Sequence, residues 1–190
     1  MSEQHTHERT AATEQPAVTE QPPVAADDDT SLPLFHRTVR PEWIDYNGHM
    51  SEAFYVLVFG YATDAMMIET GLHAGYREST GCSLYTAEAH VRYLREVAAG
   101  SHLAVRTRLL GVDAKKTRFC HELYVVDAPD DVPEPEAAPV ATTELLALHV
   151  DQREGRTAPF PDSVRERLAS LVEPAPTWAG RSIAEVPAVR

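Results

Sequence analysis

The stretch SEAFYVLVFGYATDAMMIET, residues 51–70, carries apolar side chains around most of the circumference of a helix. Such a pattern is typical of a helix that is buried on nearly all sides. Ser51 stands where an N-cap is expected, Glu52 lies favourably in the first turn, and Gly71 is a suitable stop. The stretch therefore predicts a long central helix that the rest of the chain must surround.

Segments typical of β-strands lie on both sides of this helix. LPLFHRTVR (32–40) is expected to form a first strand, which Pro41 ends. Four segments with apolar and polar alternation follow the helix, at 82–94, 102–112, 116–126 and 140–150. An amphipathic segment at 161–172 predicts a second helix. One strand, a buried helix and an antiparallel meander predict an α+β fold in which the sheet wraps around the helix, the hot-dog architecture.

The negative charge of the chain is concentrated in two segments outside this pattern. The formal net charge is −12, of which −6 comes from residues 1–30 and −5 from residues 127–136. Residues 1–30 are poor in large apolar side chains, so we expect a disordered acidic tail. The acidic, proline-rich stretch 127–139 is expected to be a solvated loop insertion. The folded domain then spans 31–172, and 173–190 form a C-terminal extension.

Composition excludes several classes of protein. No run of 18 apolar residues exists, which argues against a membrane span, and no dense cluster of Lys and Arg suggests a nucleic-acid surface. Cys82 and Cys120 stand alone, without metal-binding or disulfide-rich spacing, which fits a reducing cytoplasm. We expect a cytoplasmic protein with no metal site and no cofactor.

A cluster of polar residues directly precedes the central helix, in the order DYNGH (45–49). Asp45 and Asn47 have the residue types that form a turn and cap a helix. The same side chains could also carry chemistry, because the free N–H groups at the helix start favour negative charge in this loop. The residues alone leave both readings open.

The spacing of this cluster resembles two branches of hot-dog enzymes. Asp45-x-x-Gly48, with Tyr55 ten residues after the acid, resembles the 4-hydroxybenzoyl-CoA thioesterases. Asp45-x-Asn47-x-His49, also ending in Tyr55, is similar to plant acyl-carrier-protein thioesterases. The phrase AHVRYLREVAAGSHLAV (89–105) matches the usual way into the next strand in this group. With GRSI (180–183), the chain looks most like the betainyl-CoA thioesterases that accompany carnitine dehydrogenase.

The resemblance implies a thioester hydrolase that acts on a small acyl-CoA, including betainyl-CoA in carnitine breakdown. Asp45 would be the nucleophile or the general base, and Asn47 and His49 would assist it. The backbone N–H groups of Ser51, Glu52 and Ala53 would form the oxyanion hole. Such hot-dog sheets pair with a second copy, so we expect a homodimer or a dimer of dimers.

Substrate contacts are expected from residues around the same loop. Relatives carry two asparagines where this chain has Ser51 and Glu52, and a carboxylate at Glu52 would favour a quaternary ammonium group. Tyr55, Trp43 and Tyr46 are aromatic candidates for the substrate pocket, since cations bind aromatic faces. The expected contacts to the CoA phosphates are basic side chains: Arg92, Arg95, Lys116 and Arg118.

Two other functions remain open from the sequence. A hot-dog enoyl-CoA hydratase or dehydratase would pair His49 with the mid-helix acid Asp64, but the proline-rich run that follows the histidine in those enzymes is absent. A non-catalytic acyl-CoA-binding module is the third hypothesis, although no DNA-binding segment accompanies the domain. Hydrolysis of an acyl-CoA would separate the first hypothesis from both.

Overall fold

The computed structural model describes residues 31–187, so the predicted acidic tail at 1–30 lies outside the described residues. The elements follow in this order: β1 (Phe35–Thr38), the 3-10 helix η1 (Pro41–Trp43), α1 (Glu52–Glu69), α2 (Ala74–Thr80), β2 (Cys82–Tyr93), β3 (His102–Val112), β4 (Lys116–Val126), β5 (Ala141–Asp151), β6 (Arg156–Thr157) and α3 (Asp162–Ser170). The predicted long helix and the four long strands are confirmed with ends that differ by at most one residue.

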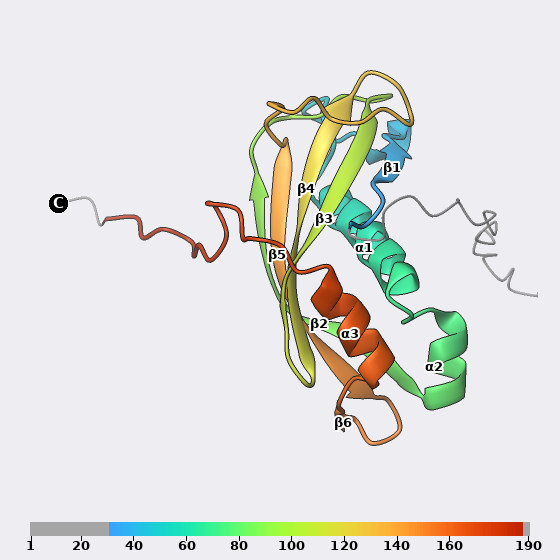
Figure 1. The fold of residues 1–190 in the computed structure, drawn as a ribbon. Coiled ribbons are helices and arrows are strands. Elements are labelled where there is room, and N and C mark those ends of the chain that lie inside the picture. Colours follow the sequence, from blue (N-terminus) through green and yellow to red (C-terminus); the bar gives the residue numbers. More distant parts are fainter. Residues whose placement is uncertain (1–30, 188–190) are drawn as a thin grey trace, which may run out of the picture.

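The strands form one antiparallel sheet in the order β1-β3-β4-β5-β2, with the short β6 paired to β5. The long β2 is an edge strand, and the four-residue β1 forms the other edge. Register shifts at Thr86/Glu88 and Leu109/Gly111 mark two irregularities that add bend to the sheet. Figure 1 shows the curved sheet with α1 lying against one face.

The core fills the space between α1 and the sheet. Five helix residues at helical spacing are buried: Tyr55, Val58, Phe59, Ala62 and Met66. Alternate residues of β3 and β4, such as Leu103, Val105 and Phe119, are fully buried against them. The predicted α+β hot-dog architecture is therefore confirmed.

The helix is less enclosed than its sequence predicts. Val56, Leu57 and Ile68 are 50%, 38% and 59% exposed on the side of α1 that faces away from the sheet. The expectation of burial on nearly all sides is wrong for a single chain, because one sheet covers only one side of a helix. The apolar character of the opposite side needs another partner to explain it.

The helix α2 and the strand β6 are absent from the sequence-based expectation. Helix α2 has only seven residues, too few for a clear apolar period. Its ends carry local signals instead, because the His73 side chain accepts a hydrogen bond from the Tyr76 N–H (3.2 Å) and Gly81 takes a left-handed conformation. After a turn, the two residues of β6 pair antiparallel with the end of β5, Thr157 with Val150 and Arg156 with Asp151.

The acidic segment 127–139 forms an irregular connection between β4 and β5, and all of its acidic side chains are exposed. The Asp131 carboxylate accepts a hydrogen bond from the Ala128 N–H (2.8 Å), which closes a turn. Arg95 donates from its guanidinium to the Ala138 carbonyl and so attaches the end of the loop to the segment after β2. In the described part of the chain, no helix is long and apolar enough to cross a membrane.

Candidate active site

The DYNGH segment forms a tight loop whose base is part of the fold. Ile44 and Met50 face each other in an antiparallel bridge, and the Asp45 N–H donates to the His49 carbonyl (3.0 Å). The Gly48 N–H donates to the Asp45 carbonyl (3.0 Å), and Gly48 has φ of +84°. A side chain at Gly48 would be strained in this left-handed conformation. Glycine is therefore needed here for the turn itself.

The Asp45 carboxyl group both holds the loop and remains half-buried beside it. Its Oδ1 accepts a hydrogen bond from the Asn47 N–H (2.8 Å), which is an Asx turn. Among the residues that the structure describes, no partner is recorded for Oδ2. The turn-forming and the chemical readings of Asp45 are thus compatible, since they use different oxygens. The Asn47 residue is exposed at the tip of the loop.

The start of α1 lies directly after this loop. Ser51 occupies the N-cap position, but its side chain makes no capping hydrogen bond. Its N–H donates to the Trp43 carbonyl (2.9 Å), so this group is already occupied. The expected set of oxyanion donors therefore narrows to the N–H groups of Glu52 and Ala53, at the positive end of the helix.

His49 lies at the end of the loop and has an acidic partner. Its Nε2 lies 3.2 Å from Glu96 Oε2, and both side chains are solvent-accessible. The Met50 N–H donates to the Val97 carbonyl (2.8 Å), which keeps the segment after β2 beside the loop. The contact uses Nε2 of the imidazole ring and leaves Nδ1 for another partner. Glu96 is a residue that the sequence reasoning missed.

Two tyrosine rings flank the helix start. Tyr55 is buried, donates its hydroxyl to the Arg95 carbonyl (3.3 Å) and meets the Tyr93 ring edge-on at 5.3 Å between centroids. The Tyr93 hydroxyl lies 3.5 Å from the Glu52 carbonyl oxygen. Burial, with the charge of Glu96, raises the pKa of Tyr55, and burial, with the charge of Glu52, raises the pKa of Tyr93. Both phenols therefore remain protonated at neutral pH.

Tyr93 was also missed as a site residue, although the sequence holds a signal for it. Tyr93 and Glu96 both belong to the phrase YLREV (93–97), which resembles the corresponding phrase of the thioesterases. Roughly 40 residues separate this phrase from the loop, and only the fold brings the two together.

The structure places the two other aromatic residues expected to contact the substrate in different surroundings. Trp43 is 5% exposed and stacks on Phe54 with 5.4 Å between ring centroids, so it packs in the core. Tyr46 is 97% exposed at the tip of the loop. Among the described residues, the ring of Tyr55 meets that of Tyr93 edge-on and the ring of Trp43 stacks with that of Phe54, so the expected aromatic residues do not form one cage within one chain.

The four basic residues expected to bind CoA lie in two different parts of the fold. Arg92 lies at the end of β2 and Arg95 just after it, with Arg95 bonded to the acidic segment. Lys116 lies 3.5 Å from Asp113 in the β3–β4 turn, and Arg118 donates to Glu144 (2.6 Å). Lys116 begins β4 and lies about 24 Å along that strand from Leu123. The Leu123 carbonyl accepts from the Val140 N–H, and the Val140 carbonyl accepts from the Arg95 N–H, so Leu123 marks the end of the sheet where Arg95 lies. Of the four, only Arg95 is near the candidate site, because Arg92 lies opposite Thr142 in the register and faces the outer side of the sheet.

Asp64 lies on the exposed side of α1, and neighbouring atoms desolvate its carboxyl group and raise its pKa. Asp64 comes twelve positions after Glu52 in the helix, about 18 Å along the axis. Within one chain, Asp64 and His49 are too far apart for the paired chemistry of a hydratase. In residues 31–187, no group of three or more metal-ligating side chains is placed to hold a metal ion.

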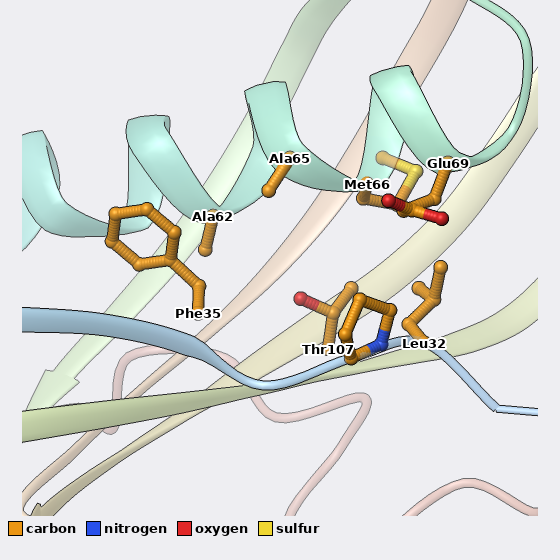
Figure 2. Close-up of a pocket in the computed structure, with 8 residues that line it drawn as sticks. Leu32, Phe35, Ala62, Ala65, Met66, Glu69 and Thr107 are labelled. Atoms are coloured by element: carbon orange, nitrogen blue, oxygen red, sulfur yellow. The ribbon is translucent and has the colours of Figure 1, made fainter. Parts of the chain in front are cut away.

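A small hollow opens at the other end of α1, between the helix, β3 and the segment before β1 (Figure 2). It is lined mainly by apolar side chains, with Glu69 and Thr107 at its rim, and its volume of about 10 Å³ is room for one water molecule. A second hollow of about 130 Å³ lies beside it, between β3 and the chain after α3. Neither hollow includes the loop that carries Asp45.

Comparisons with known proteins show the family of this chain. The family model of the thioesterase-like superfamily matches residues 39–168. A betainyl-CoA thioesterase of Pseudomonas aeruginosa is 41% identical over 164 residues, which cover 84% of this chain and 98% of that protein. A two-function protein of Agrobacterium fabrum, L-carnitine dehydrogenase/betainyl-CoA thioesterase, is 42% identical over 83% of this chain and 31% of its own length.

Solved structures show the same fold. A Staphylococcus aureus protein characterised in complex with CoA has a TM-score of 0.72 and 26% identity, covering 86% of this chain and 100% of that one. A proposed thioesterase of Pseudomonas putida has a TM-score of 0.67 and 37% identity, covering 83% and 98%.

Proposed function

Since the chain belongs to the thioesterase-like superfamily, we propose that it is an acyl-CoA thioesterase whose substrate is a small acyl group with a positive charge, betainyl-CoA in the first place. The 41% identity to a betainyl-CoA thioesterase over nearly the whole of that relative is the observation that carries the substrate class. The position of Asp45 beside the start of α1 is the observation that supports hydrolysis as the reaction.

Hydrolysis needs an attacking group, donors for the oxyanion and a leaving thiolate. In the proposed mechanism, the carboxylate of Asp45 either removes a proton from water as the water attacks the thioester carbon, or attacks that carbon itself. The N–H groups of Glu52 and Ala53 stabilise the negative oxygen that develops, at about 3 kcal/mol for a well-placed donor. The carbon–sulfur bond then breaks, and CoA leaves as a thiolate that takes up a proton. Where Asp45 is the nucleophile, the acyl group stays on its carboxyl group as an anhydride, which water hydrolyses to the free acid and the Asp45 carboxylate.

The surroundings of the helix start support a cationic acyl group. The Glu96 carboxylate is close enough to Tyr55, and the Glu52 carboxylate close enough to Tyr93, to add to the effect of burial in raising the pKa of each phenol. A quaternary ammonium group is attracted by carboxylates and by aromatic faces, whereas a fatty acyl chain gains nothing from the carboxylates. Arg95, just after β2, is the proposed contact for CoA phosphates, since Arg92 faces the outer side of the sheet.

We also propose a homodimer in the cytoplasm. The 12-residue β2 forms an open edge, and Tyr85 to Ala89 of this strand are exposed in one chain. Open edges of this length invite pairing with another strand. A second copy at β2 would also explain the exposed apolar side of α1, and it would supply walls for a site that one chain leaves open. The two free cysteines, Cys82 and Cys120, suit a reducing compartment.

A panel of acyl-CoA substrates tests the proposed activity. Release of free thiol would be followed with betainyl-CoA, butyryl-CoA, benzoyl-CoA, 4-hydroxybenzoyl-CoA and a medium-chain acyl-CoA. We expect the highest kcat/KM with betainyl-CoA. Thiol release from none of these substrates, with binding retained, would instead favour an acyl-CoA-binding module.

The variant Glu52→Gln tests the basis of the charge preference. The substitution keeps the size of the side chain and the backbone N–H but removes the negative charge. We expect KM for betainyl-CoA to rise about two- to fivefold, as for the loss of a solvent-exposed ion pair, with KM for butyryl-CoA unchanged. An equal change for both substrates would contradict a role of the Glu52 charge in selectivity.

A further inference from the structure

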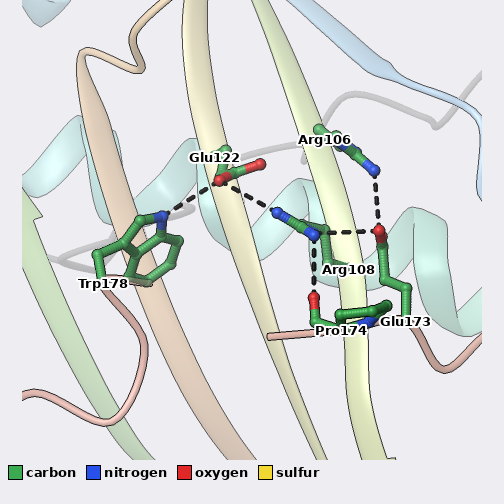
Figure 3. A network of polar contacts seen from close by, with 6 residues as sticks. All are labelled: Arg106, Arg108, Glu122, Glu173, Pro174 and Trp178. Atoms are coloured by element: carbon green, nitrogen blue, oxygen red, sulfur yellow. Dashed lines mark hydrogen bonds and ion pairs between the residues drawn. The ribbon is translucent and has the colours of Figure 1, made fainter. Parts of the chain in front are cut away.

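The chain after α3 crosses the outer face of the sheet, the face opposite α1. Glu173 binds Arg106 at 2.9 Å and Arg108 at 3.2 Å, and the Pro174 carbonyl accepts from Arg108 at 2.9 Å (Figure 3). The Trp178 indole then donates to Glu122 at 3.2 Å. Along this segment, the contacts therefore pass from β3 to β4.

The crossing continues to β5 and heads for the edge of the sheet. The Gly180 N–H donates to Glu144 Oε2 (2.6 Å), a residue of β5. In the order of the sheet, β2 comes next, and it is the last strand. Residues 173–180, which we call the strap, therefore run across the strands one after another toward the open β2 edge.

The strap is a firmly placed part of the fold. Glu122 is 6% exposed, and Cys120 and Thr142 on the same face are 0% and 1% exposed. Burial, together with the charge of Glu122, raises the pKa of the Cys120 thiol to about 12. Side chains on the outer face of the sheet are buried to this extent only if the strap stays packed on them. The contacts between the strap and this face therefore set the direction of the strap.

Beyond Gly180, the chain leaves the surface of its own sheet. Residues 181–187 are all exposed, and the apolar side chains of Ile183 and Val186 are 86% and 91% exposed. Figure 1 shows this segment extending away from the sheet on the side of β5 and β2. The anchored strap therefore ends in a segment that presents two large apolar side chains to water, available for another surface to cover.

We propose that residues 181–187 form an arm that packs on the outer sheet face of a second copy of this chain. The inference rests on the proposed homodimer, in which the second copy continues the sheet beyond β2. Seven extended residues reach up to about 24 Å, and neighbouring strands are about 4.8 Å apart, so the arm passes β2 and covers strands beyond it. By two-fold symmetry each arm lies on the other subunit.

The chemistry of the outer face suits the arm. His90 lies opposite Glu144 in the register, so Glu88, His90 and Arg92 share the outer face of β2. The arm carries one residue of each charge, Arg181 and Glu185, besides its two apolar side chains. The arm would therefore meet a mixed-charge surface in the second copy and bury Ile183 and Val186 against it.

Photo-crosslinking in mixed dimers tests this placement directly. A photoreactive amino acid replaces Ile183, and 14N- and 15N-labelled proteins are mixed until their subunits have exchanged. We expect crosslinked peptides that join a 14N arm to a 15N sheet peptide. If the wild type sediments as a monomer at all concentrations, the homodimer itself is refuted; if it is a dimer and all crosslinks join peptides of one label, the arm proposal alone is overturned.

Subunit exchange between fluorescently labelled dimers provides the second measurement. The double variant Ile183→Asp, Val186→Asp changes only exposed side chains, so its fold should be unaffected. We expect exchange about tenfold faster than in the wild type, the effect of about 1.4 kcal/mol at the interface. The matched control is Val132→Asp, which changes an apolar residue that is 73% exposed in the acidic loop. Exchange at the same rate in the double variant and the control would refute the arm.

Discussion

At the scale of single residues, His121 is a fully buried histidine beneath α1 with both ring nitrogens bonded. Thr63 donates its hydroxyl to the Phe59 carbonyl (3.0 Å), so its oxygen is the acceptor for His121 Nε2 at 2.9 Å. His121 Nδ1 then accepts from the Thr107 hydroxyl at 2.9 Å. Burial lowers the pKa of His121 to about 3, and the ring is neutral in the folded protein.

This histidine should make the protein less stable in acid. The pKa of His121 is near 6.5 in the unfolded chain and about 3 in the folded one, so between these values the unfolded state binds the extra proton. We expect the free energy of unfolding to fall by up to about 1.4 kcal/mol per pH unit as pH decreases from about 6 to 4. Urea unfolding of the wild type and of His121→Gln, at each pH, measures the difference in slope. Equal slopes would contradict a buried neutral His121.

Sequence reasoning found the residues of the loop but only part of their surroundings. Asp45, Asn47, Gly48 and His49 lie together because they are neighbours in the chain. The alternation of β4 could have placed His121 on the inner face, between Phe119 and Leu123, yet alternation alone gives no hydrogen-bond partners. The places of Glu96 and Tyr93 in the site could not be predicted, because they depend on the pairing of β2 with β5 and on the approach of Val97 to Met50.

At the scale of elements, the loop and helix start act as one unit whose shape depends on Gly48. Gly48 and Gly111 both have open space where a Cβ would be added, but only Gly48 has a positive φ, of +84°. We expect Gly48→Ala to cost about 1–2 kcal/mol of local strain, to distort the loop and to lower kcat/KM.

The matched control is Gly111→Ala, which adds the same methyl group in β3 without requiring a left-handed backbone. Its kcat/KM should remain at the wild-type value. Thiol-release kinetics and thermal unfolding of both variants test this contrast. Equal activity in the two variants would mean that the geometry of the loop has no part in catalysis.

The long elements were predictable because their patterns are long. The helix at 52–69 and strands of 11 or 12 residues repeat their periods often enough to be recognised. The seven-residue α2 and two-residue β6 do not. Burial of α1 was overestimated because its apolar pattern reflects every surface that it will meet, and one chain supplies only the surface of its own sheet.

At the scale of the whole molecule, the strap joins the C-terminal extension to the sheet through buried charges. Arg108 and Glu122 are 17% and 8% exposed at their side chains and lie 3.7 Å apart, and Arg108 also holds Glu173 and the Pro174 carbonyl. We expect Arg108→Met to destabilise the protein by about 2–4 kcal/mol, because Glu122 loses the cation beside it.

Arg106→Met is the matched control for that change. Arg106 binds Glu173 as well, but its side chain is 48% exposed, so its loss should cost less than about 1 kcal/mol. Chemical unfolding of both variants gives the two free energies. If Arg108→Met costs no more than Arg106→Met, the buried network does not hold the strap.

The path of the strap could not be predicted from the sequence, which marked 173–190 only as an extension. Proline-rich segments carry no periodic pattern, and Trp178 meets Glu122 only once β3 and β4 are paired. The fold class, in contrast, followed from the order of elements, since a sheet wrapped around a helix buries the apolar faces of both.

The central claim is that Asp45 drives thioester hydrolysis, and the variant Asp45→Asn tests it most directly. Asparagine keeps a side-chain oxygen that can accept from the Asn47 N–H, so the turn survives while the negative charge is lost. Steady-state thiol release from the best substrate of the panel is the measurement, with thermal unfolding as the check on the fold. We predict a kcat about 10³-fold lower with KM and unfolding temperature unchanged. A kcat within about threefold of the wild type would contradict the role of Asp45, and with it the proposed mechanism.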